Sequence, residues 1–417
     1  MKKADARSVA VVGAGIIGVT AAFELACRGY EVSLFDSDKP GEAGPSKGNA
    51  GHIAAGDISP VSGPGIAWTG LKMLTHRNGA LKIGVRHLPK LAPWLWQFRN
   101  AGKGKKFETA TSAITRLGAG SVNATEQLFI KAGIGGLLKR TPALYVYESK
   151  KSYDASMESW ELKQKAGREY TRLSSDEVLK LEPGLLRTVA GGVLAHDWAV
   201  VSDPLDVVKG IHSAATSKGV RFHRTSVTSL SCDAAGVVLS TCNGAHQFDM
   251  VVIAAGLASR GFAESLGEKL PLESEGGYNL TYGTPAVTVN HPIVFADRGI
   301  TATRLESGLR IGGWAVFSGP NAAARPEYFD RLQKLSKTVF PSLYDRNPKS
   351  WMGRRPSLPD SVPVISKSTK DQRIFYVTGH GHYGLTWAAR TAEHLADLVE
   401  GADDKCSDYS IRRWQPI

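Results

Sequence analysis

The chain has 417 residues, of which 42% are hydrophobic and 22% are charged. This balance excludes a disordered chain and a polytopic membrane protein, and the length is enough for two or three domains with a large core. The net charge is +12, but the basic residues are scattered and no nucleic-acid-binding motif accompanies them, so we expect no nucleic-acid partner.

The first elements predict a β-α-β unit. Residues 8–12 form a short β-branched run, residues 19–28 have a helical pattern that Gly29 ends, and residues 31–35 form a second strand. The basic residues before this apolar stretch also resemble a signal peptide, but the glycines and Glu24 inside it favour strand, turn and helix. No other stretch approaches the roughly 18 apolar residues of a membrane span.

Three glycines join this strand to this helix, in the pattern Gly13-x-Gly15-x-x-Gly18. The first allows a tight turn, the second lets the backbone approach a pyrophosphate at the helix N-terminus, and the third allows close packing. Asp36 lies 18 residues after Gly18, where a carboxylate accepts a ribose hydroxyl. A structural glycine turn is the alternative. The predicted dinucleotide contacts are Gly13, Ala14, Gly15, Ile16, Ile17, Gly18 and Asp36.

The later elements alternate between helix-rich and strand-rich segments. Residues 40–65 are rich in glycine, serine and proline and too long for a plain connection, which predicts a functional loop. Residues 66–190 are largely helical in pattern, and residues 278–317 alternate with period two, which predicts antiparallel strands. Further predicted elements are strands at 143–147, 220–223, 250–254 and 375–378 and helices at 204–217, 326–340 and 385–400.

The four cysteines form no C-x-x-C pair and do not lie beside histidines at metal-binding spacing. This predicts reduced thiols in a cytoplasmic protein and no metal site.

The glycine motif alone does not distinguish NAD from FAD. It lies near the start of the chain, and a glycine-rich strand, loop and helix recur near its end, with the loop Gly379-His-Gly-His-Tyr-Gly384. A long cofactor lying across the sheet would need both segments.

Five stretches together make the sequence resemble a known family. They are the glycine motif through Asp36, residues 46–52, residues 251–256, residues 353–360 with Pro363, and residues 379–386. In this order they resemble the FAD-dependent amine and amino-acid oxidoreductases of the D-amino-acid oxidase type, and within these the bacterial D-amino-acid dehydrogenases. The resemblance covers nearly the whole chain.

The resemblance implies an α/β fold, with a Rossmann-like FAD-binding domain and a second, substrate-binding α+β domain built on an antiparallel sheet. The expected FAD-binding domain comprises residues 1–75, 195–265 and 345–417, and the expected substrate-binding domain comprises residues 76–194 and 266–344. We expect non-covalent FAD, because no histidine or cysteine here matches the covalent attachment sites of some relatives.

The resemblance also implies flavin contacts beyond the glycine motif. The loop 46–52 matches the family loop that passes the diphosphate and the flavin, and Val227 matches a position that contacts the adenine. An ordinary glycine-rich loop and a plain core position are the alternatives. The expected contacts are Ser46, Asn49, Ala50, Gly51, His52, Val227, Ala255, Gly256, Gly353, Gly379, His380, Gly381, Gly384, Leu385 and Thr386.

Three residues are expected at the substrate. Arg355 stands where the family's G-x-R-P arginine pairs with a substrate carboxylate, although a salt bridge elsewhere is the alternative. Tyr278 lies in a stretch that resembles one near the family's substrate cavity. His382 is a candidate acid–base group, with lining of the pocket as the alternative.

The implied reaction is oxidative deamination of a D-amino acid, with D-proline-like imino acids among the candidates. Hydride transfer to FAD would leave an imino acid that hydrolyses to a 2-oxo acid, and the electrons would pass to a quinone or another carrier. Three alternatives stay open: a sarcosine or glycine oxidase-like enzyme that uses oxygen, a flavin-binding regulatory protein without turnover, and one subunit of a hetero-oligomer.

Residues 88–99 are aromatic and basic. They predict either a core helix with a charged edge or a peripheral contact with an anionic inner membrane.

Overall fold

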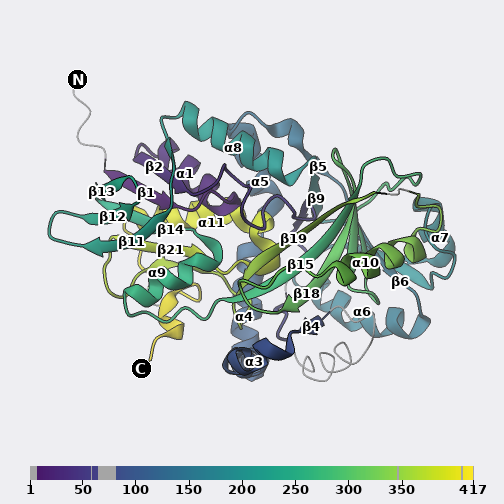
Figure 1. Ribbon diagram of the computed structural model, residues 1–417. Helices are drawn as coiled ribbons and strands as arrows, with labels where there is room; N and C mark the ends of the chain where they lie inside the picture. Colours follow the sequence, from purple (N-terminus) through teal and green to yellow (C-terminus); the bar gives the residue numbers. More distant parts are fainter. Residues whose placement is uncertain (1–6, 58, 64–80, 345–346, 405–406, 417) are drawn as a thin grey trace.

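The computed structural model of the chain describes residues 7–57, 59–63, 81–344, 347–404 and 407–416. Two large sheets organise it, one at each end of the molecule in Figure 1. Helices cover both sheets, and the site described below draws its residues from the elements of both.

The first sheet has six strands in the order β10-β2-β1-β14-β21-β20. All neighbours pair in parallel except β20 with β21. This is the parallel arrangement expected from the β-α-β unit, and the predicted strands agree with it to within a few residues. Its strands are β1 (Ser8–Val12), β2 (Glu31–Asp36), β10 (Arg221–Arg224), β14 (Met250–Ile253), β20 (Val364–Lys367) and β21 (Ile374–Thr378).

Two different layers cover the faces of this sheet. On one face the helices α1 (Ile16–Cys27), α8 (Pro204–Ser217) and α11 (Gly384–Val399) share one apolar core with the sheet. The first and last of them lie side by side, so segments from the two halves of the sequence, near its start and near its end, pack together (Figure 1). On the other face lies a small antiparallel sheet of β11 (Val227–Cys232), β12 (Val237–Thr241) and β13 (Gly244–Phe248).

The second large sheet has nine strands and is mainly antiparallel, as the period-two pattern predicted. The helices α10 (Pro326–Val339), α6 (Lys150–Lys165) and α7 (Ser175–Leu181) pack on its strands. The strands are β19 (Lys349–Ser357), β15 (Glu273–Tyr282), β18 (Gly308–Phe317), β17 (Ile300–Leu305), β16 (Ile293–Phe295), β6 (Ala143–Tyr147), β8 (Gly191–Ala195), β7 (Tyr170–Ser174) and β4 (Leu81–Ile83).

The remaining elements connect these layers. A third sheet joins the strands β3 (His52–Ala54), β9 (Trp198–Val201) and β5 (Leu138–Arg140). The other helices and short turns are η1 (Val85–His87), α3 (Leu88–Ala101), α4 (Gly104–Gly118), α5 (Ser121–Lys131), η2 (Gly135–Leu137), η3 (Gly256–Ala258), α9 (Ser259–Ser265), η4 (Gly381–Tyr383) and η5 (Ile411–Trp414).

Two segments lie with a different sheet from the one that the expected domain boundaries give them. The strand β19 belongs to the nine-stranded sheet, although residues 345–417 were expected in the FAD-binding domain. The helices α4 and α5 pack against α11 and share its apolar core, although residues 76–194 were expected in the other domain. The apolar pattern of a helix in the sequence predicts which of its faces is buried, but it does not predict which sheet or helix covers that face.

Within the described ranges, no helix is long and apolar enough to cross a membrane.

Candidate functional site

A cavity of about 1390 Å³ is lined by residues of both large sheets. Single-ligand pockets are usually about 300–1,000 Å³, so this cavity has room for a large cofactor together with a small substrate. Its lining includes Asp36 at the end of β2 and Thr386 in the first turn of α11. Of the predicted site residues, Ala14, Gly18 and Gly51 lie outside its lining.

The glycine turn between β1 and α1 makes one wall of the cavity. Gly13 has φ +107°, and a Cβ added to it would lie 2.5 Å from the carbonyl oxygen of Ala254. A Cβ on Gly18 would lie 1.7 Å from the carbonyl oxygen of Gly13, so the absence of a side chain at Gly18 lets the helix pack closely against the turn. The Asp36 carboxylate accepts a hydrogen bond from the Ala14 N–H at 2.7 Å. The backbone thus forms a bare cradle at a helix N-terminus, which fits a cofactor's pyrophosphate.

The loop of residues 46–51 lies along the cavity and is held at both ends. The Ser46 hydroxyl accepts a hydrogen bond from the Ile16 N–H, in the first turn of α1, at 3.0 Å. Arg310 of β18 donates to the carbonyl oxygens of Asn49 at 2.6 Å and Lys47 at 3.2 Å. This buried arginine was missed by the sequence analysis, because only the fold brings β18 to the loop.

Two histidines, the half-buried His52 and the buried His380, line the cavity in their neutral form. Burial lowers the pKa of His52 to about 4, and its Nε2 lies 2.5 Å from the Thr303 hydroxyl. Burial also lowers the pKa of His380 to about 3, and its Nε2 lies 3.0 Å from the Thr391 hydroxyl. Both side chains are suited to polar contacts and not to proton transfer at neutral pH.

The N-terminus of α11 faces the cavity through Gly384, Leu385 and Thr386. No side chain caps this helix, so its first N–H groups stay available to an anionic group. The Thr386 hydroxyl accepts from the Ala54 N–H at 3.0 Å, which joins the helix to β3. This arrangement can stabilise negative charge on a reduced flavin, as the terminal glycine loop implied.

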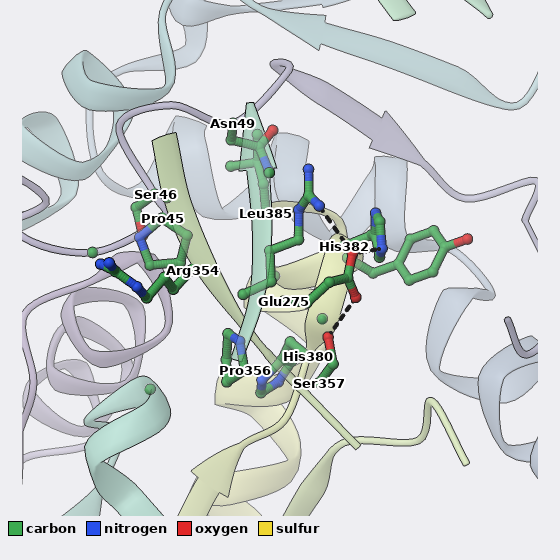
Figure 2. Close-up of a pocket in the computed structure, with 18 of the residues that line it drawn as sticks. Pro45, Ser46, Asn49, Glu275, Arg354, Pro356, Ser357, His380, His382 and Leu385 are labelled. Carbon is green, nitrogen blue, oxygen red and sulfur yellow. Dashed lines mark hydrogen bonds and ion pairs between the residues drawn. The ribbon is translucent and has the colours of Figure 1, made fainter. Parts of the chain in front are cut away.

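A buried glutamate organises the other end of the cavity (Figure 2). Glu275 of β15 is 5% exposed. One carboxylate oxygen lies 2.6 Å from Nε2 of His382 and 2.9 Å from Nη1 of Arg355, and the other accepts from the Ser357 hydroxyl at 2.8 Å. Burial raises the pKa of Glu275, but the charges and hydrogen bonds of these three neighbours outweigh it and lower the pKa to about 2.

Arg355 therefore lies in the cavity and also forms a salt bridge. The same nitrogen that contacts Glu275 donates to the carbonyl oxygen of Trp314 at 3.0 Å. A Cβ on Gly277 would lie 2.3 Å from Nη2 of Arg355, so the guanidinium lies flat across a glycine. These contacts fix its orientation, which favours recognition of a planar carboxylate.

Tyr278 does not join this cluster. Its ring packs against Tyr328 and Phe329 of α10, and its hydroxyl accepts from the Arg325 N–H at 3.2 Å. Tyr278 lines the cavity, but within the residue ranges that the structure describes its side chain has no hydrogen bond or ion pair with Glu275, His382 or Arg355. Its role at the substrate stays a prediction. Arg354 also lines the cavity, and it donates to the Ala322 carbonyl oxygen and not to Glu275.

A second polar cluster in the cavity was also missed. The Asp57 carboxylate pairs with Lys163 of α6 at 2.9 Å and accepts from the Tyr145 hydroxyl at 3.1 Å. The Tyr383 hydroxyl lies 3.5 Å from its other oxygen. These residues come from four separate elements, and nothing in their local sequence links them.

No group of three or more metal-binding side chains occurs in the described part of the chain. Cys27, Cys232 and Cys242 are free, and Cys406 lies outside the described residues.

The salt bridges of Glu275 predict a change in stability with pH. Its pKa falls from 4.5 to about 2 on folding, so its contribution is full above pH 4.5 and is lost as pH falls through 2. The difference corresponds to about 3 kcal/mol at neutral pH. We expect Glu275→Gln to lower the free energy of unfolding at pH 7 and to narrow its gap from the wild type at pH 3. Urea unfolding at both pH values measures this difference in unfolding free energy. The same difference at pH 7 and at pH 3 would contradict the prediction.

Comparisons with known proteins agree with this geometry. The family model described as FAD dependent oxidoreductase (DAO) matches residues 8–398. The D-amino-acid oxidase of Bradyrhizobium diazoefficiens is 31% identical over 404 residues, covering 95% of this chain and 96% of that protein. A D-amino acid dehydrogenase of Vibrio atlanticus is 29% identical over 419 residues, covering 97% of this chain and 99% of that protein.

Solved structures show the same fold. The glycine oxidase from Geobacillus kaustophilus matches with a TM-score of 0.76 at 21% identity, covering 98% of this chain and 100% of that chain. The L-proline dehydrogenase from P. horikoshii matches with a TM-score of 0.75 at 18% identity, covering 98% of both chains. With the cradle, the cavity and the family match in agreement, the chain belongs to the DAO family of FAD-dependent oxidoreductases, and FAD is its cofactor.

Proposed function

We propose that this enzyme oxidatively deaminates D-amino acids, D-proline-like imino acids among them. The observation that carries the proposal is the guanidinium of Arg355, held in the cavity by Glu275 and by the Trp314 carbonyl oxygen. A fixed guanidinium recognises a carboxylate through two parallel hydrogen bonds. The relatives named D-amino-acid oxidase and D-amino acid dehydrogenase support the choice of substrate.

The protein's part in the reaction is to position charge. When bound in the cavity, FAD would supply the acceptor for the hydride of the substrate α-carbon. Arg355 binds the carboxylate, the glycine turn and the loop of residues 46–51 hold the cofactor, and the N-terminus of α11 offers N–H groups to developing negative charge. The imino acid then hydrolyses in water to a 2-oxo acid and ammonia.

Anaerobic reduction of the flavin tests the proposal. The purified enzyme is mixed without oxygen with D-proline, cis-4-hydroxy-D-proline, D-alanine, their L-enantiomers and sarcosine, each separately. Bleaching of the flavin spectrum by D-compounds alone is the expected result. Acid precipitation should release the flavin into solution, because we propose that its attachment is non-covalent.

Other outcomes select the alternatives. Bleaching by sarcosine or glycine, followed by rapid reoxidation in air, would favour an oxidase that resembles the glycine oxidase structures. A bound flavin that no amino acid reduces would favour a regulatory protein or a missing partner subunit.

We further propose that electrons leave at an anionic membrane surface that carries a quinone. Val85, Leu88 and Trp96 are 84%, 45% and 68% exposed on η1 and α3. Leu91 and Trp94 of α3 are buried, so this helix has one side toward the core and one toward solvent. The exposed basic residues in the same stretch of the chain, from η1 to the start of α4, are Arg86, Lys90, Arg99, Lys103, Lys105 and Lys106. An apolar patch within basic residues is typical of interfacial helices.

Sedimentation with vesicles tests this surface. We expect the enzyme to sediment with vesicles that contain phosphatidylglycerol and not with neutral phosphatidylcholine vesicles. Trp96→Ser should weaken binding, because a large exposed ring is lost from the interface. A control variant at the exposed Tyr344, Tyr344→Ser, should bind as the wild type does. Equal sedimentation of wild type and Trp96→Ser would contradict the assignment of this surface.

A further inference from the structure

We propose that Glu275 orients His382 so that its Nδ1 accepts a proton from the α-ammonium group of the substrate. The inference rests on the proposed function and adds a proton acceptor to it. Glu275 acts here as a positioning residue, because it acts through His382 and not on the substrate.

The carboxylate of Glu275 decides which nitrogen of His382 carries hydrogen. The distance from its oxygen to Nε2 of His382 is 2.6 Å. The same carboxylate pairs with the guanidinium of Arg355 and accepts a hydrogen bond from Ser357, and both contacts favour its ionised form. An ionised carboxylate only accepts hydrogen bonds, so Nε2 must donate. The neutral imidazole then has its lone pair on Nδ1.

Nδ1 is free to meet a substrate. His382 lines the cavity with a side chain that is 39% exposed, whereas the side chain of Glu275 is 6% exposed. Among the described residues, no hydrogen bond to Nδ1 of His382 is present. Exposure on the cavity side also gives the proton a route to water after it is taken up.

His382 and Arg355 are spaced for one amino acid. Both contact the same oxygen of Glu275, at 2.6 Å and 2.9 Å, so the two side chains are neighbours. The α-ammonium and α-carboxylate groups of an amino acid are attached to the same carbon. A carboxylate on Arg355 therefore brings the ammonium group next to the imidazole.

The proton balance of the step is complete. One N–H bond of the ammonium breaks, its proton moves to Nδ1, and a neutral amine remains with its lone pair. That lone pair forms the C=N bond as the α-hydrogen leaves with its electrons. The resulting imidazolium faces Glu275 from β15 and Arg355 from β19, with Tyr383 next in the chain and Asp57 beyond it. The Glu275 charge stabilises the imidazolium, which suits a base.

Kinetics of flavin reduction in His382→Gln test the proton acceptor. Glutamine can still donate to Glu275 from near the Nε2 position, but it has no base at the Nδ1 position. We expect the reduction rate at pH 7 to fall by about 10²–10⁴-fold, as for loss of a general base, and to recover at alkaline pH as the substrate loses its proton in solution. The matched control His196→Gln, at an exposed histidine outside the cavity lining, should keep the wild-type rate.

The positioning role of Glu275 has its own signature. In Glu275→Gln the imidazolium loses its counter-charge, so the acid limb of the pH profile should move to lower pH. A merely structural glutamate would lower the rate or the stability without moving this limb.

A measurement without turnover completes the test. Nitrogen-15 NMR of histidine-labelled enzyme, with His382 identified by its loss in His382→Gln, should show hydrogen on Nε2 in the neutral form. Hydrogen on Nδ1, or a wild-type rate and pH profile in His382→Gln, would overturn this inference but leave the proposed function standing. A wild-type flavin that no amino acid reduces would instead overturn the proposed function, and the proton acceptor with it.

Discussion

Arg355→Met is expected to lower kcat/KM for the amino-acid substrate by about 30- to 4,000-fold, which corresponds to about 2–5 kcal/mol. Methionine has a similar reach but cannot bind the carboxylate. It also leaves the carboxylate of Glu275 buried without its guanidinium partner. Removing one side of a buried salt bridge costs about 3–5 kcal/mol of unfolding free energy, so stability should fall as well. Anaerobic flavin reduction and urea unfolding measure the two effects.

Two further variants separate charge, geometry and position. Arg355→Lys keeps a cation beside Glu275, so it should recover most of the stability but little of the kcat/KM, because an ammonium group lacks the planar fork. Arg354→Met should lower kcat/KM less than Arg355→Met does, because Arg354 lines the cavity but is held by the Ala322 carbonyl oxygen and not by Glu275. A large loss of kcat/KM in Arg354→Met together with a small loss in Arg355→Met would contradict our assignment, because Arg354 would then be the arginine that binds the carboxylate.

The place of Arg355 in the cavity could be predicted from a short motif that resembles one of the family, whereas that of Glu275 could not. The strand β15 is buried along its whole length, from Glu273 to Tyr282, so exposure gives its polar residues no periodic pattern. The partner of Glu275 is 80 residues away, and only the register of β15 against β19 sets Glu275 opposite Arg355. Such a register depends on the packing of the whole sheet.

The contact of Arg355 with Trp314 was hidden for a different reason. Trp314 has φ +66°, a left-handed conformation that is rare for a large side chain. It lies in β18 beside a register shift of β15 between Gly276 and Tyr278. The shift turns the Trp314 carbonyl oxygen toward the guanidinium. The segment has a plain alternating pattern in the sequence, and the neighbouring Gly312 and Gly313 are the only local sign of a bulge.

The nucleotide half of the fold was predictable because its signals are local. The short β-branched strand, the glycine turn and the helix lie within twenty residues of one another, and each constrains the next. The helix α1 begins at Ile16, earlier than the predicted Val19, because Gly15 already serves as its N-cap. By contrast, α4 and α5 could be predicted as helices but not assigned to α11, since that contact depends on distant parts of the chain.

Gly18→Ala should abolish FAD binding and destabilise the nucleotide half more than any other single methyl group added to the turn. The new Cβ would lie 1.7 Å from the Gly13 carbonyl oxygen and 2.8 Å from its carbon, and both are backbone atoms. No side-chain movement relieves this contact, so the turn itself must open. Overpacking costs about 1–3 kcal/mol where neighbours can adjust, and here we expect at least the upper value. Flavin content after purification and thermal unfolding measure the result.

Gly15→Ala is the matched control, because it adds the same methyl group three residues away. Gly15 has φ −71°, which any residue adopts, and its added Cβ would lie 3.3 Å from the Ser46 hydroxyl, a side-chain atom that can move. The fold should therefore keep nearly its full stability. The methyl group would still project where the pyrophosphate approaches α1, so FAD affinity should fall without loss of structure. Full flavin content in purified Gly18→Ala would contradict the role of this turn, whereas weak FAD binding in a stable Gly15→Ala protein would separate cofactor contact from folding.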